Sequence, residues 1–376
     1  MPSDLAQPAA PIETSLSDSE SISVPGGALE GLVSRLFVAL GVPGDGAATV
    51  AGALVDAERD GRASHGVMLV SLYADRIRLG SVSTHTQAVV VQDHGAVVVM
   101  DARHALGQLT ADQGMATAIE RALRHGLGAV AVRHAFHFGT ASRYALAAAQ
   151  RGCIGVALCN TRPLMPAPGG AEALVGNNPL AIALPSASGA PPVLDMALSE
   201  VAMGKIRMAE AGGQSIPGNW ATDANGMPTT DPAAAIRGML LPAAGPKGFG
   251  LAFMVDMLCG VLSSGAWGGA VTPLYGNLAM PYDCAHFFLA INVANFRPLS
   301  EFEAEVSAAV ERVRASRAAP GSERIYSPGD IEQERREKAR RSGDLITLPA
   351  SVARQLRELA SSLRIDPAPL QPAGKT

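Results

Sequence analysis

The sequence predicts an α/β (α+β) protein, with helices near both ends of the chain and a sheet in the middle. Apolar residues recur at helical spacing over residues 29–40, and a glycine and a proline follow directly. From Gln87 the period changes to short valine-rich runs bounded by turn residues, which is typical of strands. Towards the other end, the densely charged residues 332–341 and the segment 351–363 again indicate helices.

Between these ends, predicted strands alternate with predicted helices. No strand is followed by a Gly-x-Gly-x-x-Gly turn and a helix, so the sequence argues against a Rossmann domain. The strand–loop–helix–strand unit over residues 128–158 is a place where sites tend to form, because loops leaving buried strands carry function. The remaining predicted helices cover about 45–58, from Ser64 to Gly80, 109–125, 246–261 and 300–317, and the predicted strands cover 89–91, 97–99, 128–132, 153–158 and 286–292.

Length and composition exclude several classes of protein. The net charge of -4 over 376 residues, without any basic cluster, argues against nucleic acid as a partner. No apolar run is long enough for a membrane span. The four cysteines lack metal-type spacing, so we expect reduced thiols in a cytoplasmic protein and no metal site. Residues 1–25 have the composition of a disordered tail rather than of a signal peptide. Residues 367–376 are predicted to be a frayed end of the chain.

A histidine near the start of the third helix is the first candidate for chemistry. Ser64 stands where a helix N-cap is expected, which places His65 in the first turn and Leu69 and Tyr73 on the same face. The positive end of the helix dipole disfavours a charged imidazole. A neutral histidine can accept or return a proton, as hydride transfer at a carbonyl carbon requires. The alternative is a histidine that only packs on an amphipathic helix.

Two further residues could support this chemistry. His137, next to Gly139 in the loop after a buried strand, is a second candidate proton carrier or substrate contact, or a histidine that merely lines a turn. Asp195 follows a buried strand, where an isolated carboxylate would be costly. We expect it to hydrogen-bond His65 and fix its tautomer. The alternative is that Asp195 caps the helix through Lys205.

Loops rich in glycine and side-chain amides point to a bound ligand. They cover residues 160–163, 166–170 and 175–179, where backbone N–H groups could approach a ligand closely. Lys247, among glycines at the start of a helix, suits a phosphate or carboxylate. Ordinary turns and a solvated lysine are the alternatives.

In this order, these motifs resemble one family, the type-2 malate/L-lactate dehydrogenases, over about residues 29–363. That family includes ureidoglycolate dehydrogenase, sulfolactate dehydrogenase, diketogulonate reductase and piperideine-2-carboxylate reductase. The residues that carry the resemblance are Ser64-His65-Gly66 with Tyr73, His137-Phe138-Gly139, Pro168-Gly169-Gly170, Gly176 to Pro179, Asp195-Met196-Ala197, Trp220 with Asp223, Thr229 to Pro232, and Lys247 to Gly250.

The resemblance implies an NAD- or NADP-dependent oxidoreductase that acts on a carbonyl or imine carbon of a small 2-oxo or 2-hydroxy acid. It implies a non-Rossmann fold, with a mixed, mainly antiparallel sheet and a helical domain built from both chain ends, in a homodimer. The implied domains are helical over 26–85 and 298–366 and cofactor-binding over 86–297. The implied site residues are His65, Asp195 and His137 for catalysis, Ser64, Leu69, Tyr73 and Arg162 for substrate, and Thr161, Asn178, Met196, Ala197, Lys247 and Gly248 for the cofactor.

Three departures from the family pattern bear on the substrate. Leu69 stands where the family usually has an arginine that binds the substrate carboxylate. Asn177 replaces a threonine, and Leu198 replaces another close to the expected cofactor site. Either Arg162 or another base takes over the carboxylate, or the substrate lacks it. A cyclic imine or ketone reductase and a non-catalytic family member are therefore the alternative functions.

Overall fold

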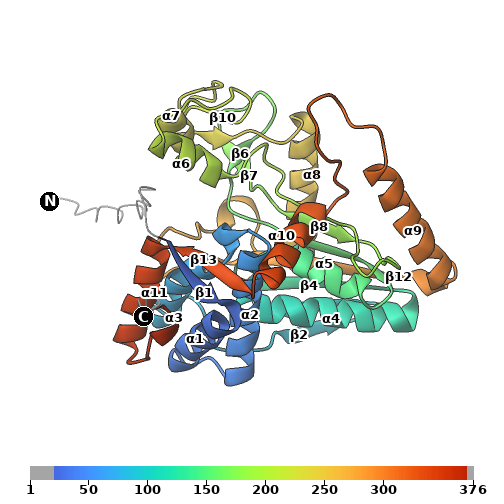
Figure 1. Ribbon diagram of the computed structural model, residues 1–376, viewed down its shortest axis with the longest axis horizontal. Helices are drawn as coiled ribbons and strands as arrows, with labels where there is room; N and C mark the ends of the chain where they lie inside the picture. Colours follow the sequence, from blue (N-terminus) through green and yellow to red (C-terminus); the bar gives the residue numbers. More distant parts are fainter. Residues whose placement is uncertain (1–20, 371–376) are drawn as a thin grey trace.

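The computed structural model describes residues 21–370, and the predicted tails outside this range are not described further. The predicted tails, residues 1–25 and 367–376, extend too far into this described range. Residues Ser21–Pro25 form strand β1, which pairs antiparallel with β13 (Leu345–Pro349), so the two ends of the chain lie side by side (Figure 1). Leu370 is fully buried at the end of a short 3-10 turn. This strand pairing orders the apolar residues near both ends of the chain. Composition alone does not reveal the pairing.

A seven-stranded sheet forms the centre of the molecule, in the order β2-β3-β4-β12-β5-β8-β9. Only β3 and β4 run parallel, and every other neighbouring pair is antiparallel. The prediction of a mixed, mainly antiparallel sheet is therefore confirmed. The bounds are β2 (Val89–Asp93), β3 (Val97–Asp101), β4 (Leu127–Ala135), β12 (Cys284–Asn292), β5 (Cys153–Cys159), β8 (Leu180–Ala183) and β9 (Val193–Met196).

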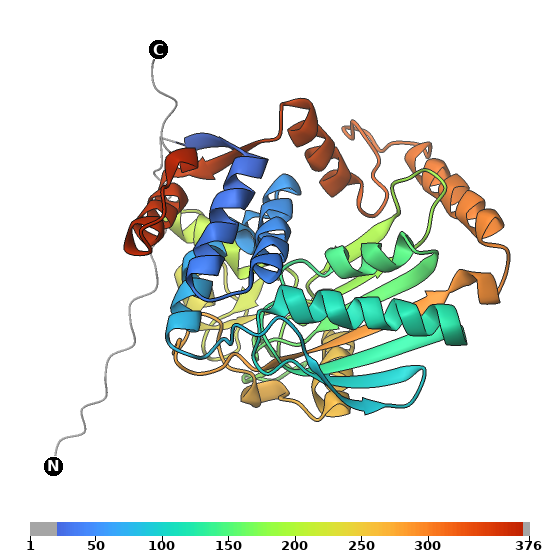
Figure 2. The same cartoon turned by 90° about the horizontal axis from the view of Figure 1, so that it is seen from below.

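Two helices, α4 (Gly107–His125) and α5 (Ser142–Ala149), cover one face of this sheet (Figure 2). They approach closely because glycines lie beneath them. A Cβ at Gly128 would stand 2.1 Å from the Ala118 carbonyl oxygen, and one at Gly155 would stand 2.4 Å from that of Ala145. A hydrophobic core containing Phe288 and Ala157 fills this layer and continues into the helices at the chain ends.

A second core lies on the other face of the sheet and includes Leu158, Val255 and Ala285. The helix predicted over 246–261 is α8 (Pro246–Asp256) continued by a π-helical turn (Met257–Val261). The smaller elements on this side are β6 (Met165–Pro166), β7 (Ala173–Val175), α6 (Met203–Ala211), β10 (Ala221–Thr222), α7 (Pro232–Arg237) and β11 (Met239–Leu240).

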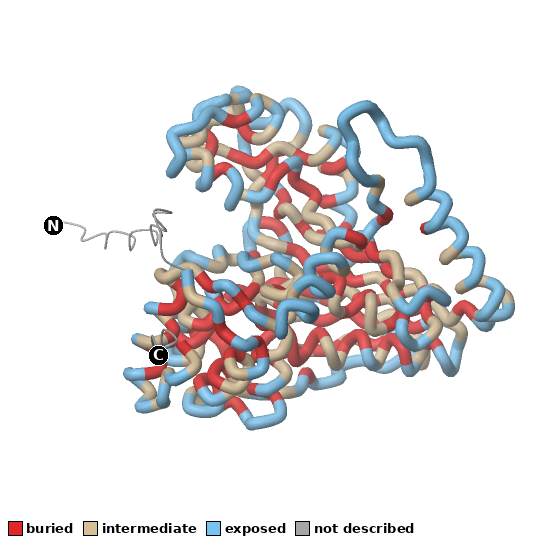
Figure 3. Tube along the Cα trace, viewed as in Figure 1, coloured by how far each residue is buried: buried red, intermediate tan, exposed pale blue. Residues whose placement is uncertain are grey.

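Most helices from the two chain ends pack together beside the sheet, but the helix over residues 299–314 stands apart from them on the far side of the sheet (Figure 1). Buried Arg76 ties them to the loop before β12, because its guanidinium donates to the carbonyl oxygens of Met280 (2.8 Å) and Leu274 (2.9 Å). Figure 3 shows buried residues concentrated in this part and around the sheet. The remaining helices are α1 (Gly26–Ala39), α2 (Gly44–Arg59), α3 (Val70–Arg78), α9 (Leu299–Arg314), α10 (Asp330–Arg341) and α11 (Ala350–Ser362). No helix in residues 21–370 has both the length and the apolarity needed to cross a membrane.

Candidate active site

His65 lies on an irregular segment between α2 and α3, not in the first turn of an α-helix. Two 3-10 turns, Ala63–His65 and Val67–Leu69, precede α3, which starts only at Val70. The prediction of Ser64 as a helix N-cap is therefore wrong. The cause is Glu58, whose Oε1 accepts the Val67 N–H at 2.8 Å. The same carboxylate packs against Gly66, because a Cβ there would stand 2.0 Å from Oε1 and would require the Glu58 side chain to move.

The rings of His65 and His137 stack, with centroids 5.5 Å apart and planes inclined by 26°. Burial lowers the pKa of His65, with a further lowering by Arg62 and an opposing effect of Asp195. Because His65 lies in a 3-10 turn ahead of α3, the expected place in the first turn of an α-helix, on which the dipole argument depended, is wrong. The Ser64 hydroxyl contacts His65 Nδ1 at 3.0 Å. Burial therefore favours the neutral form of His65.

His137 has a hydrogen-bond partner that orients it. Tyr73 Oη lies 2.6 Å from His137 Nδ1, and the Gln108 amide donates to the same oxygen at 3.3 Å. The phenol has one proton, and the roles of Oη and Nδ1 depend on the tautomer of His137: when Tyr73 donates to Nδ1, the proton of the neutral ring sits on Nε2. Burial, together with His65 and His286, lowers the pKa of His137 to about 3, so the ring is neutral at physiological pH.

Asp195 does not make the hydrogen bond that the sequence predicts. Its Oδ2 accepts the Ser142 N–H at 3.1 Å and lies 3.6 Å from an Arg62 guanidinium nitrogen. Asp195 therefore caps the start of α5. The alternative, a cap on the helix through Lys205, is also wrong, because Ala202 caps α6. Asp195 still acts on His65 through space, since its charge raises the pKa of that imidazole.

The predicted substrate residues lie in different environments. Tyr73 is fully buried, and Leu69, with 1% of its surface exposed, is part of the hydrophobic core. Arg162 is exposed in the segment that leaves β5, where its guanidinium donates to the Pro163 carbonyl oxygen at 3.4 Å. Desolvation lowers the pKa of Arg162, and the nearby charge of Arg207 lowers it further. Leu69 therefore packs in the core, while Arg162 presents a cation.

The predicted cofactor loops meet through backbone hydrogen bonds. The Leu198 N–H donates to the Asn177 carbonyl oxygen (2.7 Å), and the Ala243 N–H donates to that of Leu198 (2.9 Å). Asn178 is fully buried, accepts the Thr161 N–H at 2.8 Å and donates to the Ala252 carbonyl at 2.8 Å. The polar atoms of the Asn178 side chain therefore hold these loops together, and the predicted role of Asn178 in cofactor binding stays a prediction.

The start of α8 carries donors of the kind that bind a nucleotide phosphate. Gly248 lies against the preceding loop, since a Cβ there would stand 2.1 Å from the Ala243 carbonyl oxygen. Exposed Lys247 is in the first turn, where free backbone N–H groups point outward. Met196 and Ala197, both half-buried, follow Asp195 in the segment joined to this loop. Backbone N–H groups and a lysine at a helix start are donors of the kind that a nucleotide phosphate requires.

Sequence reasoning missed several functional residues. Gln108 lies in the first turn of α4, and the sequence gives no signal that its amide is fully buried against Tyr73. In the sequence Glu58 is an ordinary charged residue near the end of α2, yet it is half-buried and its carboxylate accepts a hydrogen bond from the His65 segment. Arg62 is three residues from His65 and therefore could have been suspected.

Comparisons with known proteins agree with this fold. The solved sulfolactate dehydrogenase of Methanocaldococcus jannaschii superimposes with a TM-score of 0.87 at 32% identity, covering 92% of this chain and 99% of that one. The (2R)-3-sulfolactate dehydrogenase (NADP(+)) of Chromohalobacter salexigens is 37% identical over 89% of this chain and 96% of its own length. The ureidoglycolate dehydrogenase (NAD(+)) of Escherichia coli K12 is 35% identical over 83% of this chain and 88% of its own.

These similarities define the class of protein: it is an NAD(P)-dependent oxidoreductase. More narrowly, the family model described as malate/L-lactate dehydrogenase matches residues 24–357, and the chain belongs to that family. The predicted resemblance, the enzyme class and the choice of NAD or NADP as cofactor are thereby confirmed.

Proposed function

We propose that this enzyme interconverts a small 2-hydroxy acid and the corresponding 2-oxo acid, with His65 and His137 handling the reacting oxygen. The single observation that carries this proposal is the stacked histidine pair, of which His137 is oriented by Tyr73. Bound NAD or NADP supplies or accepts the hydride. His65 accepts the hydroxyl proton during oxidation and returns it during reduction. The His137 Nε2–H donates to the same oxygen and stabilises its developing charge.

Asp195 and Arg62 tune this proton exchange in the proposal. They act on His65 in opposite directions, Asp195 raising its pKa and Arg62 lowering it. They also contact each other at 3.6 Å, so neither charge is isolated beside the imidazole. Ser64 holds Nδ1 of His65, which leaves Nε2 for the substrate. Asp195 is therefore a positioning and tuning residue, not a group that contacts the reacting atoms.

The substrate carboxylate is bound by Arg162 in this proposal. Leu69 cannot do so, because it is apolar and packs in the core. Arg162 is exposed, charged and tethered only by a long bond to a backbone carbonyl. A guanidinium is the side chain best suited to bind a carboxylate through two parallel hydrogen bonds. The sulfolactate and ureidoglycolate relatives act on hydroxy acids by name, which supports a substrate of this class.

The cofactor in this proposal is held by Lys247, by the backbone at Gly248 and by the segment Thr161, Met196 and Ala197. These residues meet where the loops of residues 161–178, 195–198 and 241–248 are joined by backbone hydrogen bonds. The Lys247 ammonium and the first N–H groups of α8 neutralise phosphate charge. Asn178 stabilises the loops from within.

A substrate screen tests the proposed function. Purified full-length protein is assayed with NADH and with NADPH against pyruvate-like 2-oxo acids and against cyclic imines that lack a carboxylate. We expect turnover of 2-oxo acids and a fall of about 100-fold or more in kcat for His65→Ala. Turnover of carboxylate-free imines alone would favour the imine or ketone reductase. Turnover of no substrate, although cofactor binds, would favour a non-catalytic family member.

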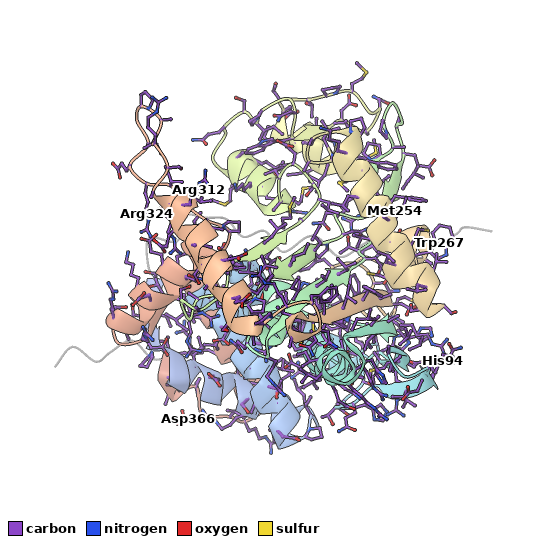
Figure 4. The ribbon with its side chains drawn as sticks, turned by 90° about the vertical axis from the view of Figure 1, so that its right-hand side faces the viewer. His94, Met254, Trp267, Arg312, Arg324 and Asp366 are labelled. Carbon is purple, nitrogen blue, oxygen red and sulfur yellow. The ribbon has the colours of Figure 1, made fainter. Side chains whose placement is uncertain are left out.

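We also propose that the protein is a homodimer in the cytoplasm. Each chain in this proposal has a helical domain, residues 26–85 and 298–366, and a cofactor-binding domain, residues 86–297. An apolar face on α8 and its π-helical turn supports the dimer, because Met254 is 58% exposed, Val261 49% and Leu262 55%. Figure 4 shows Met254 and Trp267 on the outer side of the molecule. The four cysteines are buried and free, in keeping with a reducing compartment.

A further inference from the structure

Three side chains outside the active site meet at one edge of the sheet. His104 follows β3, His134 is the second-last residue of β4, and Asp283 directly precedes β12. These strands are neighbours, in the order β3-β4-β12. One potential ligand atom from each residue lies within 4.8 Å of the other two. All three are half-buried, so an ion from solvent could reach them.

The local structure of this cluster is unusual. His104, His134 and Asp283 all have left-handed backbone conformations, with φ of 57°, 49° and 55°. Residues other than glycine rarely adopt this conformation. His104 Nδ1 is also buried without a hydrogen-bond partner in the part of the chain that is described. A buried imidazole nitrogen normally has a partner, so this nitrogen is available to bind a ligand.

We propose that His104, His134 and Asp283 form a binding site for one divalent transition-metal ion of the zinc, cobalt or nickel type. Two imidazoles and one carboxylate are a known ligand set for such ions, with open positions left for water. Asp101 is already held by Arg133 at 3.2 Å, which leaves Asp283 as the carboxylate that can bind the ion. Magnesium and calcium prefer oxygen ligands and fit this set poorly.

The geometry of His134 supports coordination. Its Nδ1 lies 2.9 Å from Asp283 Oδ1, and its Nε2 lies 3.9 Å from Asp101 Oδ2. Two ligands of a tetrahedral zinc ion are about 3.4 Å apart, given metal–ligand distances of about 2.1 Å. The His134–Asp283 pair would therefore open by about half an ångström. Asp101 would then face the other ring nitrogen, as carboxylates commonly do beside metal-bound histidines.

Cobalt(II) is a suitable probe because its visible spectrum reports its ligands. Chelator-treated full-length protein is titrated with Co²⁺ and followed by absorption and calorimetry. We expect one equivalent to bind without a thiolate-to-cobalt band, Zn²⁺ to displace it and Mg²⁺ not to compete. A thiolate band would overturn the proposal, because it would place the ion at the buried group of Cys159, Cys284 and His286, whose ligand atoms also lie within 4.8 Å of one another.

Asparagine variants isolate the three ligands, because asparagine tolerates the left-handed conformation and preserves the local fold. We expect His104→Asn, His134→Asn and Asp283→Asn each to weaken Co²⁺ binding at least tenfold, with unchanged circular dichroism. His94→Asn, at an exposed turn (Figure 4), is the matched control and should bind as the unaltered protein does. Full binding by all three variants, no saturation at one equivalent, or loss of binding in His137→Asn would overturn the proposal.

Discussion

The Tyr73 hydroxyl lies 2.6 Å from His137 Nδ1. We propose that this contact determines which nitrogen of His137 faces the substrate. When Tyr73 donates its proton to Nδ1, the neutral ring keeps its N–H on Nε2. The pKa of His137, lowered by burial to about 3, keeps the ring neutral at physiological pH. A neutral donor at this place is useful only for an oxygen that gains negative charge.

Tyr73→Phe tests this arrangement. We expect kcat to fall about tenfold, because a lost buried hydrogen bond of about 1–2 kcal/mol would no longer select the Nε2–H form. The KM for cofactor should not change. Tyr144→Phe is the matched control, since it removes a buried hydroxyl that donates to the Phe138 carbonyl oxygen at 2.5 Å rather than to a histidine. Equal losses of kcat in both variants would show that the effect is only structural.

The pH dependence of substrate oxidation tests the role of His65. The pKa of this imidazole is lowered, and oxidation requires its neutral form, so kcat/KM should stay flat down to about pH 6.5 and fall only below it. Asp195→Asn removes a charge that raises this pKa and should move the acid limb to lower pH. Arg62→Gln removes a charge that lowers it and should move the limb to higher pH. Shifts in the same direction would contradict this assignment.

The sequence predicts some parts of this structure better than others. The sheet and most helices follow from periodicity, because apolar spacing along β4, β12 and α4 matches their buried faces. The segment around His65 does not, since its shape depends on Glu58, a carboxylate in a different helix. The partner of Asp195 also escaped prediction. Which N–H reaches a carboxylate is fixed by the packing of α5 on the sheet, and no local pattern encodes this packing.

Arg162→Gln tests how the substrate carboxylate is bound. We expect KM for a 2-oxo acid to rise about 10- to 100-fold with a smaller change in kcat, because hydrogen bonds to a charged group contribute about 1.5–3 kcal/mol. Arg162→Lys should recover part of the loss, since it restores charge but not the two parallel bonds. Arg312→Gln, on α9 (Figure 4), serves as a control for general loss of positive charge. An unaltered KM in Arg162→Gln would mean that another group binds the carboxylate.

Glu58 should make the folded protein less stable as the pH rises. Burial raises its pKa from 4.5 to about 7. Below pH 4.5 the carboxyl is protonated in both the folded and the unfolded chain. Between pH 4.5 and 7 only the unfolded chain loses the proton, so the free energy of unfolding decreases, by at most about 3 kcal/mol. Glu58→Gln keeps an oxygen for the Val67 N–H and should lack this decrease.

Urea denaturation of both proteins at pH 5, 6, 7 and 8 would measure the difference. The exposed-carboxylate variant Glu120→Gln is the control and should follow the unaltered protein. A difference between Glu58→Gln and the unaltered protein that is constant with pH would show that Glu58 is already ionised in the folded state.

The apolar face of α8 should be the contact between two copies of the chain. Leu251, Met254, Leu258 and Val261 are exposed at three- to four-residue spacing, so they lie on one side of the helix and its π-helical turn. Such a face is unfavourable in water and is normally covered. We expect light scattering after size exclusion to give a dimer for the unaltered chain and a monomer for a Met254→Glu, Leu258→Glu double variant. Met227→Glu introduces the same charge at a residue that is 64% exposed in a turn and should remain dimeric. A dimer that survives the double variant would place the contact on another surface.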